Sequence, residues 1–182
     1  TAEEEWGERF EFTCLPTLNS DYLFVDDYHG RGSIEGTVQI YWDATFIRYY
    51  SLWEIDRYDV NNPSSLVSNG PGSRARDNQM TNSYSHIIWD SGNLSNGTIS
   101  EGTEYSDKSN DAGMLIDWLR YSEHKVGLWV MGDAIASDLH GSSAACALEL
   151  LTTICGVTLE NGSYFDLTGG RDSGGITSPQ VT

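Results

Sequence analysis

Positive charge is what this chain has least of. It carries 10 Lys and Arg residues against 27 Asp and Glu residues in 182, a formal net charge of −17. Because nucleic acids and anionic membrane surfaces attract basic proteins, this balance argues strongly against both as partners. It favours a soluble acidic surface, a protein that binds cations, or a salty environment.

Long hydrophobic runs are also missing. No stretch approaches the roughly 20 apolar residues of a transmembrane helix, so we expect no membrane insertion. The chain starts at Thr1 instead of Met and shows no signal peptide, which favours a mature or excised segment of a longer protein. Lys is rare, whereas Asn, Ser, Gly, Thr and Tyr are common, a composition that we associate with secreted, extracellular or cell-surface proteins.

Cysteine is scarce, with only Cys14, Cys146 and Cys155. None of them has the CxxC spacing of a metal site. We expect Cys146 and Cys155 on a buried helix and at its end, where they act as small hydrophobic residues. A disulfide from Cys14 to either of them stays open, because an odd count and unknown geometry do not decide it.

What the sequence does contain is a repeated pattern, in which an apolar run ends in aspartate and a glycine-bearing turn follows. Short unbroken apolar runs of this kind predict strands that are buried on both faces of a parallel sheet. The strands are expected at residues 22–26, 86–89 and 126–131, and an alternating segment at 53–60 predicts a fourth strand nearer an edge.

Helical periodicity separates these strands. Helices are expected at about 33–50, 75–82 and 142–154, and another is capped at Asn110-Asp111 with Met114, Leu115, Trp118 and Leu119 inward. Loops are expected at 61–73 and 92–110. The first helix has an apolar face formed by Ile34, Val38, Tyr41, Trp42 and Phe46. The order predicts an α/β fold with a doubly wound, mostly parallel sheet, flavodoxin-like order 2-1-3-4, and helices on both faces. A fifth strand starting at Val157 is only weakly indicated.

Composition divides the chain into three parts. Residues 1–20 read as a linker or edge segment, and residues 21–160 as the flavodoxin-like domain. Residues 161–182 form a tail rich in Gly, Ser and Thr or the start of a further segment.

The carboxyl ends of the predicted strands gather acidic residues. Asp26, Asp27, Asp90 and Asp133 follow three different strands, and ligands of open parallel sheets bind at this edge. Their oxygen atoms suit Ca²⁺ or Mg²⁺, and a cation would relieve the repulsion between them. The alternative is that each Asp ends its strand and accepts hydrogen bonds in the turn that follows. His29 stands beside them and is the best single candidate for a general base.

Two family resemblances bear on these residues. Leu23 to Asp27 and His86 to Gly92 resemble the first and third strands of response-regulator receiver domains, which would make Asp90 a phosphoacceptor. However, that family has Ser or Thr where this chain continues with Met131-Gly132-Asp133, and no lysine stands at a credible fifth strand.

The second resemblance covers residues 21–157. Val25-Asp26-Asp27, Ile87 to Leu94 and Leu128 to Ile135 resemble the class I glutamine-amidotransferase-like fold, in the degenerate form found in secreted bacterial proteins. Active members carry a nucleophilic Cys, activated by a His, in a tight turn after a strand. The corresponding turn, Met131 to Ala134, contains no Cys, so the resemblance implies this fold without amidotransferase activity.

We therefore expect a non-catalytic structural or interaction module of a larger extracellular protein, with Ca²⁺ or Mg²⁺ as its candidate ligand. Its expected partners are other domains of the parent protein or further copies of itself. The alternative is a metal-dependent hydrolase that uses Asp26, Asp27, Asp90 and His29, and a weaker one is a receiver-like phosphoacceptor.

Overall fold

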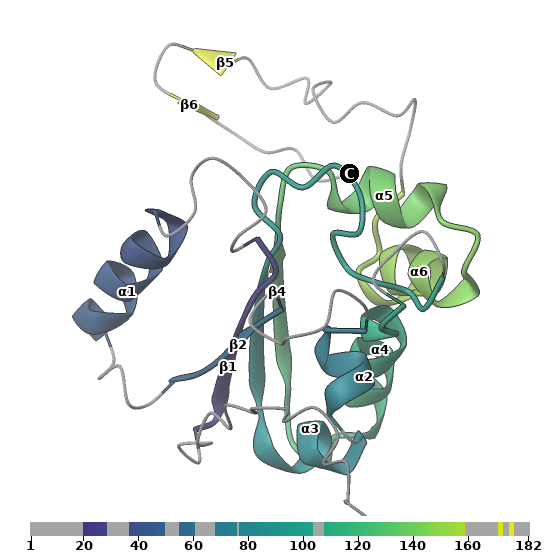
Figure 1. The fold of residues 1–182 in the computed structure, drawn as a ribbon, viewed down its shortest axis with the longest axis horizontal. Coiled ribbons are helices and arrows are strands. Elements are labelled where there is room, and N and C mark those ends of the chain that lie inside the picture. The colour runs from purple at the N-terminus through teal and green to yellow at the C-terminus, as the bar shows by residue number, and fades with distance from the viewer. Residues whose placement is uncertain are drawn as a thin grey trace, which may run out of the picture.

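The fold is built on one parallel sheet (Figure 1). The computed structural model describes residues 20–28, 37–49, 55–60, 68–75, 77–103, 108–158, 171–172 and 175–176. Its main strands are β1 (Tyr22–Asp26), β2 (Ile55–Asp59), β3 (His86–Asp90) and β4 (Gly127–Met131). They are all parallel, in the order β2-β1-β3-β4, which confirms the predicted fold class and strand order.

Helices cover both faces of this sheet, but unequally (Figure 1). One face carries α1 (Thr37–Tyr49). The other carries α2 (Pro71–Arg74), α3 (Asp77–Ser83), α4 (Asp111–Tyr121), α5 (Ile135–Gly141), α6 (Ala145–Glu149) and the π-helical turn η2 (Leu150–Ile154). None of the helices in the described ranges is long and apolar enough to cross a bilayer.

Several predicted boundaries were wrong. The predicted loop at 61–73 contains the start of α2, where Pro71 occupies the first helical turn. The final helical segment is longer than expected, because α5 precedes α6. Leu139 is the buried residue of α5, and one buried residue does not produce an apolar period in the sequence. Helical spacing predicts Ala145, Leu148 and Leu151 on the inner face of the last helix, but Leu148 is exposed. Val157 and Thr158 lie outside any strand, and Leu159 lies outside the described residues.

The tail contributes a small separate pair of strands. β5 (Arg171–Asp172) and β6 (Gly175–Ile176) pair antiparallel, within the segment expected to be a tail. The segment 1–19 lies outside the described residues.

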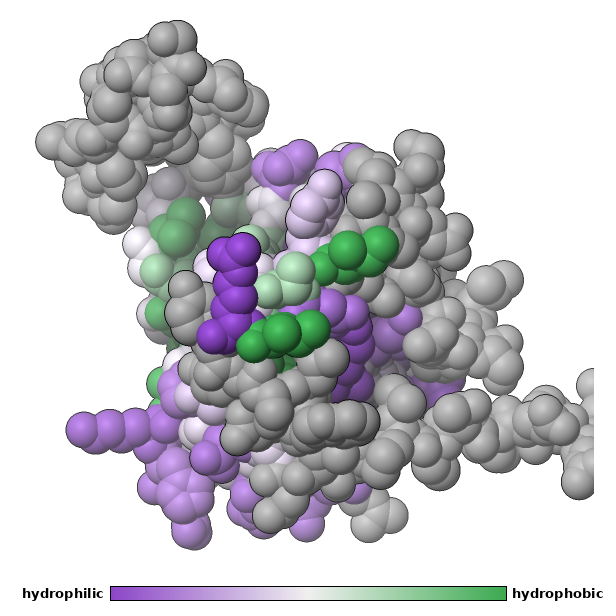
Figure 2. Space-filling model, turned by 90° about the vertical axis from the view of Figure 1, so that its left-hand side faces the viewer, coloured by the Kyte–Doolittle hydropathy of each residue, from purple (hydrophilic) through white to green (hydrophobic). Residues whose placement is uncertain are grey.

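The α1 face has a small aromatic cluster. Phe24, Phe46 and Ile55 are buried there, and Trp42 packs against them with its ring 4.8 Å from that of Phe24. This confirms Trp42 and Phe46 as inward residues of the first helix. Tyr41 was wrongly placed on that face, because its side chain is 70% exposed. Ile34 lies outside the described residues. Apolar side chains also reach the surface on this side of the molecule (Figure 2).

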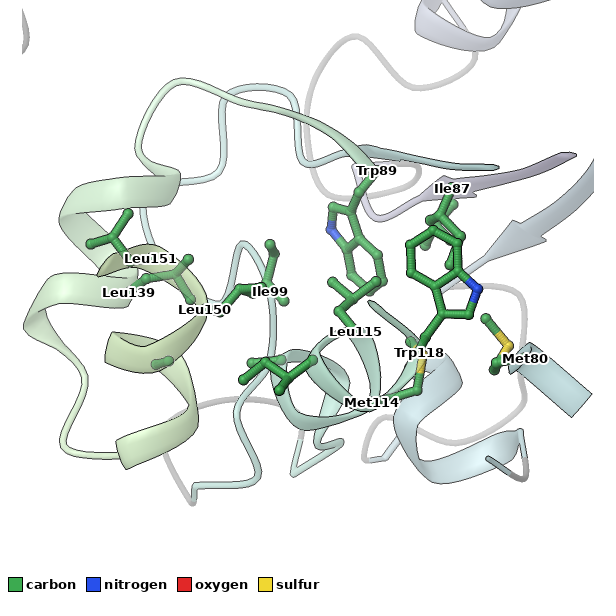
Figure 3. Close-up of a cluster of buried hydrophobic side chains, with 14 of the residues drawn as sticks. Met80, Ile87, Trp89, Ile99, Met114, Leu115, Trp118, Leu139, Leu150 and Leu151 are labelled. Carbon is green, nitrogen blue, oxygen red and sulfur yellow. The ribbon is translucent and has the colours of Figure 1, made fainter. Parts of the chain in front are cut away.

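The opposite face holds the main core (Figure 3). Ile87 and Trp89 of β3 point toward Leu115 and Trp118 of α4, and all four side chains are buried. The Trp89 indole N–H donates to the Thr98 carbonyl at 2.9 Å, so even this large side chain leaves no polar atom unpaired. The long loop after β3 is therefore tied directly into the core.

Candidate functional site

The carboxyl end of the sheet brings three aspartates side by side. Asp26 ends β1 and is in register with Asp59 of β2 on one side and with Asp90 of β3 on the other. Residues in register on parallel strands point to the same face, and Trp42 of α1 contacts Asp90, so this is the α1 face. All three side chains are buried.

Asp90 is held by hydrogen bonds at both of its carboxylate oxygens. Oδ1 accepts the backbone N–H of Gly92 at 2.9 Å, and Oδ2 accepts the indole N–H of Trp42 at 2.6 Å. Gly92 has φ +51, and a Cβ there would lie 2.5 Å from the Tyr28 ring. The turn thus requires glycine, and Asp90 acts as its acceptor.

Asp26 has a similar local role. Its Oδ1 accepts the backbone N–H of Tyr28 at 3.3 Å, again two residues further along the chain. Its Oδ2 lies 3.9 Å from Nη2 of Arg57, whose guanidinium also donates to Asp43 at 3.1 Å and lies 5.2 Å from the centre of the Phe24 ring. Arg57 therefore compensates part of the negative charge at this edge.

Asp27 and Asp133 do not complete a ligand shell. Asp27 is buried, and its backbone N–H donates to the Asp90 carbonyl at 2.9 Å. Asp133 is exposed in the turn after β4, and its N–H donates to the Gly92 carbonyl at 2.8 Å. Within the described ranges, no group of three or more His, Cys, Asp or Glu side chains is arranged to hold a metal ion. His29 lies outside the described residues.

Some polar atoms at this end of the sheet are buried without a hydrogen-bond partner in the described part of the chain. They are the hydroxyl of Tyr28 and the Nε and Nη2 atoms of Arg57. The two guanidinium nitrogens are donors, so they suit an oxygen acceptor and do not suit a cation.

Sequence reasoning missed two of the residues that shape this edge. Asp59 ends its strand as Asp26 and Asp90 do, but the alternating polarity of β2 hid the shared pattern. Arg57 was read as part of an edge strand, although its charge is the one that approaches Asp26. Trp42 was identified as a core residue, and nothing in its spacing indicated that its indole would bind Asp90.

The structure also describes the turn in which the resemblance to amidotransferase-like folds would place a nucleophile. The turn after β4 contains Gly132, Asp133 and Ala134 and no cysteine. Cys146 lies in α6 with its Sγ 3.5 Å from Oδ1 of Asn110, and burial raises the pKa of its thiol, which disfavours the reactive thiolate. Cys146 and Cys155 are free thiols, and Cys14 lies outside the described residues.

A comparison of the chain with protein-family models, with curated proteins and with solved structures found no match.

Proposed function

We propose that this chain is a non-catalytic structural or interaction module of a larger extracellular protein, with an amidotransferase-like fold that lacks the nucleophile. One observation carries the proposal: Asp26 and Asp90, the acids best placed for chemistry, each accept the N–H of the residue two positions later. Such bonds are the ordinary means by which Asp ends a strand and forms a turn. A metal-dependent hydrolase instead needs carboxylates that converge on an open cation site.

The outer face of α1 supports an interaction role. Ile40, Ala44 and Ile47 are spaced at i, i+4 and i+7, so they form one stripe along the helix. Ile40 is 65% exposed and Ile47 is 60% exposed. Exposed apolar patches are typical of protein interfaces. We assign this stripe to another domain of the parent protein, because two copies of a chain with net charge −17 repel each other.

Thermal melting with Ca²⁺ or Mg²⁺, after chelation, tests the non-catalytic role. We expect the same melting temperature with and without either cation. Asp90→Ala should lower the melting temperature by the same amount in both conditions, because it removes a turn acceptor. If a cation did bind the folded chain, a free cation concentration of 100 times its dissociation constant would raise the free energy of unfolding by about 2.7 kcal/mol. A cation-dependent rise that Asp90→Ala abolishes would replace the proposal with the hydrolase.

Sedimentation of the purified chain tests the choice of partner. We expect a monomer at low and high salt, since another domain and not a second copy covers α1. Dimerisation that strengthens with concentration and is abolished by Ile40→Asp with Ile47→Asp would show that the α1 stripe joins copies of this chain. Ile40→Asp and Ile47→Asp should leave the melting temperature nearly unchanged, because both side chains are exposed.

A further inference from the structure

The dipeptide Asn-Gly occurs three times in this chain, at Asn69-Gly70, Asn96-Gly97 and Asn161-Gly162. Asparagine is a thermolabile residue, because the backbone nitrogen of the next residue can attack its side-chain amide. Glycine as the next residue leaves that nitrogen unshielded, since it has no Cβ. The first two pairs both follow a serine, so their local sequences are closely matched, and the structure describes both. The third pair lies outside the described residues.

The fold holds the Asn69-Gly70 pair in place. Asn69 is buried, its Oδ1 accepts a hydrogen bond from the Arg74 guanidinium at 3.3 Å, and its main-chain carbonyl accepts the Tyr58 hydroxyl. Gly70 packs so closely against Asp111 that a Cβ on it would lie 2.0 Å from Oδ2 of that carboxylate. The Asn69 amide has to leave these contacts to reach the Gly70 nitrogen, so the reaction at this pair requires local unfolding.

The Asn96-Gly97 pair has the opposite surroundings, in the loop after β3. Asn96 is exposed, and within the described ranges neither its side chain nor the Gly97 N–H makes a hydrogen bond. A pocket of about 470 Å³ lies beside both residues, and Ser137, Asp138 and Ser143 are among its other lining residues. Water therefore reaches the Asn96 amide, and this amide can approach the Gly97 nitrogen without breaking a hydrogen bond of the described loop.

We propose that Asn96 is a site of spontaneous deamidation and that the fold protects Asn69 from the same reaction. The Gly97 nitrogen loses its proton and attacks Cγ of Asn96, so that a new C–N bond closes a succinimide ring and the side-chain nitrogen leaves as ammonia. Water then adds to one of the two ring carbonyls and opens the ring, which gives aspartate or isoaspartate at position 96. The reaction consumes one water molecule, releases one ammonia molecule and oxidises nothing.

The modification falls directly before the residue that anchors this loop to the core. Thr98 donates its N–H and its hydroxyl to Oδ2 of Asp138, both at 2.8 Å, and its carbonyl accepts the Trp89 indole N–H at 2.9 Å. Isoaspartate lengthens the main chain by one carbon atom just before this anchor. Both products also add a carboxylate to a pocket that already holds Asp138 and Glu101. The modified loop should hold Thr98 less firmly, so the modified chain should melt at a lower temperature.

Peptide mapping by mass spectrometry, on the full chain kept in warm and mildly alkaline buffer, tests this proposal. In the folded chain, Asn96 should convert to aspartate and isoaspartate at least about tenfold faster than Asn69, which reacts only when its segment opens. In concentrated urea the two rates should agree within about threefold, because no structure then protects Asn69. Enzymatic methylation of the isoaspartate carboxylate separates this product from aspartate.

The matched control is Asn96→Gln, because a glutamine side chain closes a ring with the next nitrogen far less readily. It should abolish the reaction at position 96, leave the rate at Asn69 unchanged, and remove the lower-melting fraction that accumulates as the unchanged chain ages. Two results would overturn the proposal: equal rates at Asn96 and Asn69 in the folded chain, and a difference that persists in urea, which would assign it to local sequence. An aged chain that melts like the fresh chain would overturn the predicted effect on the loop.

Discussion

The two faces of the sheet are built from the same strands and differ in almost every other respect. Among the described residues, the α4 face gathers sixteen buried hydrophobic residues in one cluster, and the α1 face gathers three. The α1 face also buries the charges of Asp26, Asp59 and Asp90. Because successive strand residues point to opposite faces, one strand supplies Trp89 to the core and Asp90 to the polar edge. Buried apolar side chains are therefore concentrated on the α4 face, and the row of three strand-end aspartates lies on the α1 face.

The largest effects should come from truncating the core of the α4 face. Leu115 is fully buried between β3 and the helices, so Leu115→Ala should lower the free energy of unfolding by about 2–5 kcal/mol. Phe46→Ala, on the α1 face, removes a larger side chain but should cost less, because the small cluster around Phe46 leaves a cavity open to water. Urea unfolding of both variants measures the difference.

Leu148→Ala is the control for this pair. Leu148 is exposed, so its truncation should change the free energy of unfolding by no more than about 0.5 kcal/mol. An equal or greater loss for Phe46→Ala than for Leu115→Ala would show that the α1 face contributes as much stability as the α4 face.

The core could be predicted from sequence because its signals are local. The apolar runs of β1, β3 and β4 fixed their strands, and the period of Met114, Leu115 and Trp118 identified the inner face of α4. α5 was missed because Leu139 is the one residue of this helix that is buried, and a single apolar residue shows no period. Leu148 was misassigned because Ala147, Leu150 and Leu151 form the buried face, and their spacing fits a helix as well as the spacing that includes Leu148. The contacts of the site were harder to predict from sequence, because the hydrogen bond from Trp42 to Asp90 joins residues 48 positions apart and no local pattern indicates it.

The next largest effect should come from an aspartate on the α4 face. Asp111 is buried at the start of α4, and its Oδ1 accepts the N–H of Gly72 at 2.7 Å and the hydroxyl of Ser109 at 2.8 Å. Asp111→Ala leaves the buried Ser109 hydroxyl and the half-buried Gly72 N–H without this acceptor, so it should cost about 2 kcal/mol in urea unfolding. Asp117→Ala, at an exposed position of the same helix, should cost almost nothing. If both substitutions lowered the free energy of unfolding equally, the hydrogen bonds of Asp111 would not stabilise the contact between α2 and α4.

A smaller effect is expected where α1 meets the polar edge. Trp42→Phe keeps a ring against Phe24 and removes the N–H that donates to Asp90, so it should cost about 1 kcal/mol. In a background that already carries Asp90→Ala, the same change should cost much less, because the acceptor is gone. A double-mutant cycle in urea measures this coupling. If the two losses simply add, the bond from Trp42 to Asp90 contributes nothing to stability.

The smallest effect appears only in alkali, on the α4 side. Burial, together with the hydrogen bond to Asp56 at 2.9 Å and the charge of that carboxylate, raises the pKa of Tyr84 well above its usual value of 10.0. Below about pH 10 the Tyr84 hydroxyl is mostly neutral in both the folded and the unfolded chain. Above it the unfolded chain ionises first, so the free energy of unfolding falls as pH rises until the folded-state pKa is passed.

Tyr84→Phe should make this fall in the free energy of unfolding shallower between about pH 9 and 11, measured by urea unfolding. Tyr121→Phe, at an exposed position, should leave it unchanged. If both variants keep the slope of the unchanged chain, Tyr84 ionises as freely as an exposed tyrosine, and the α4 face is open to water at its edge.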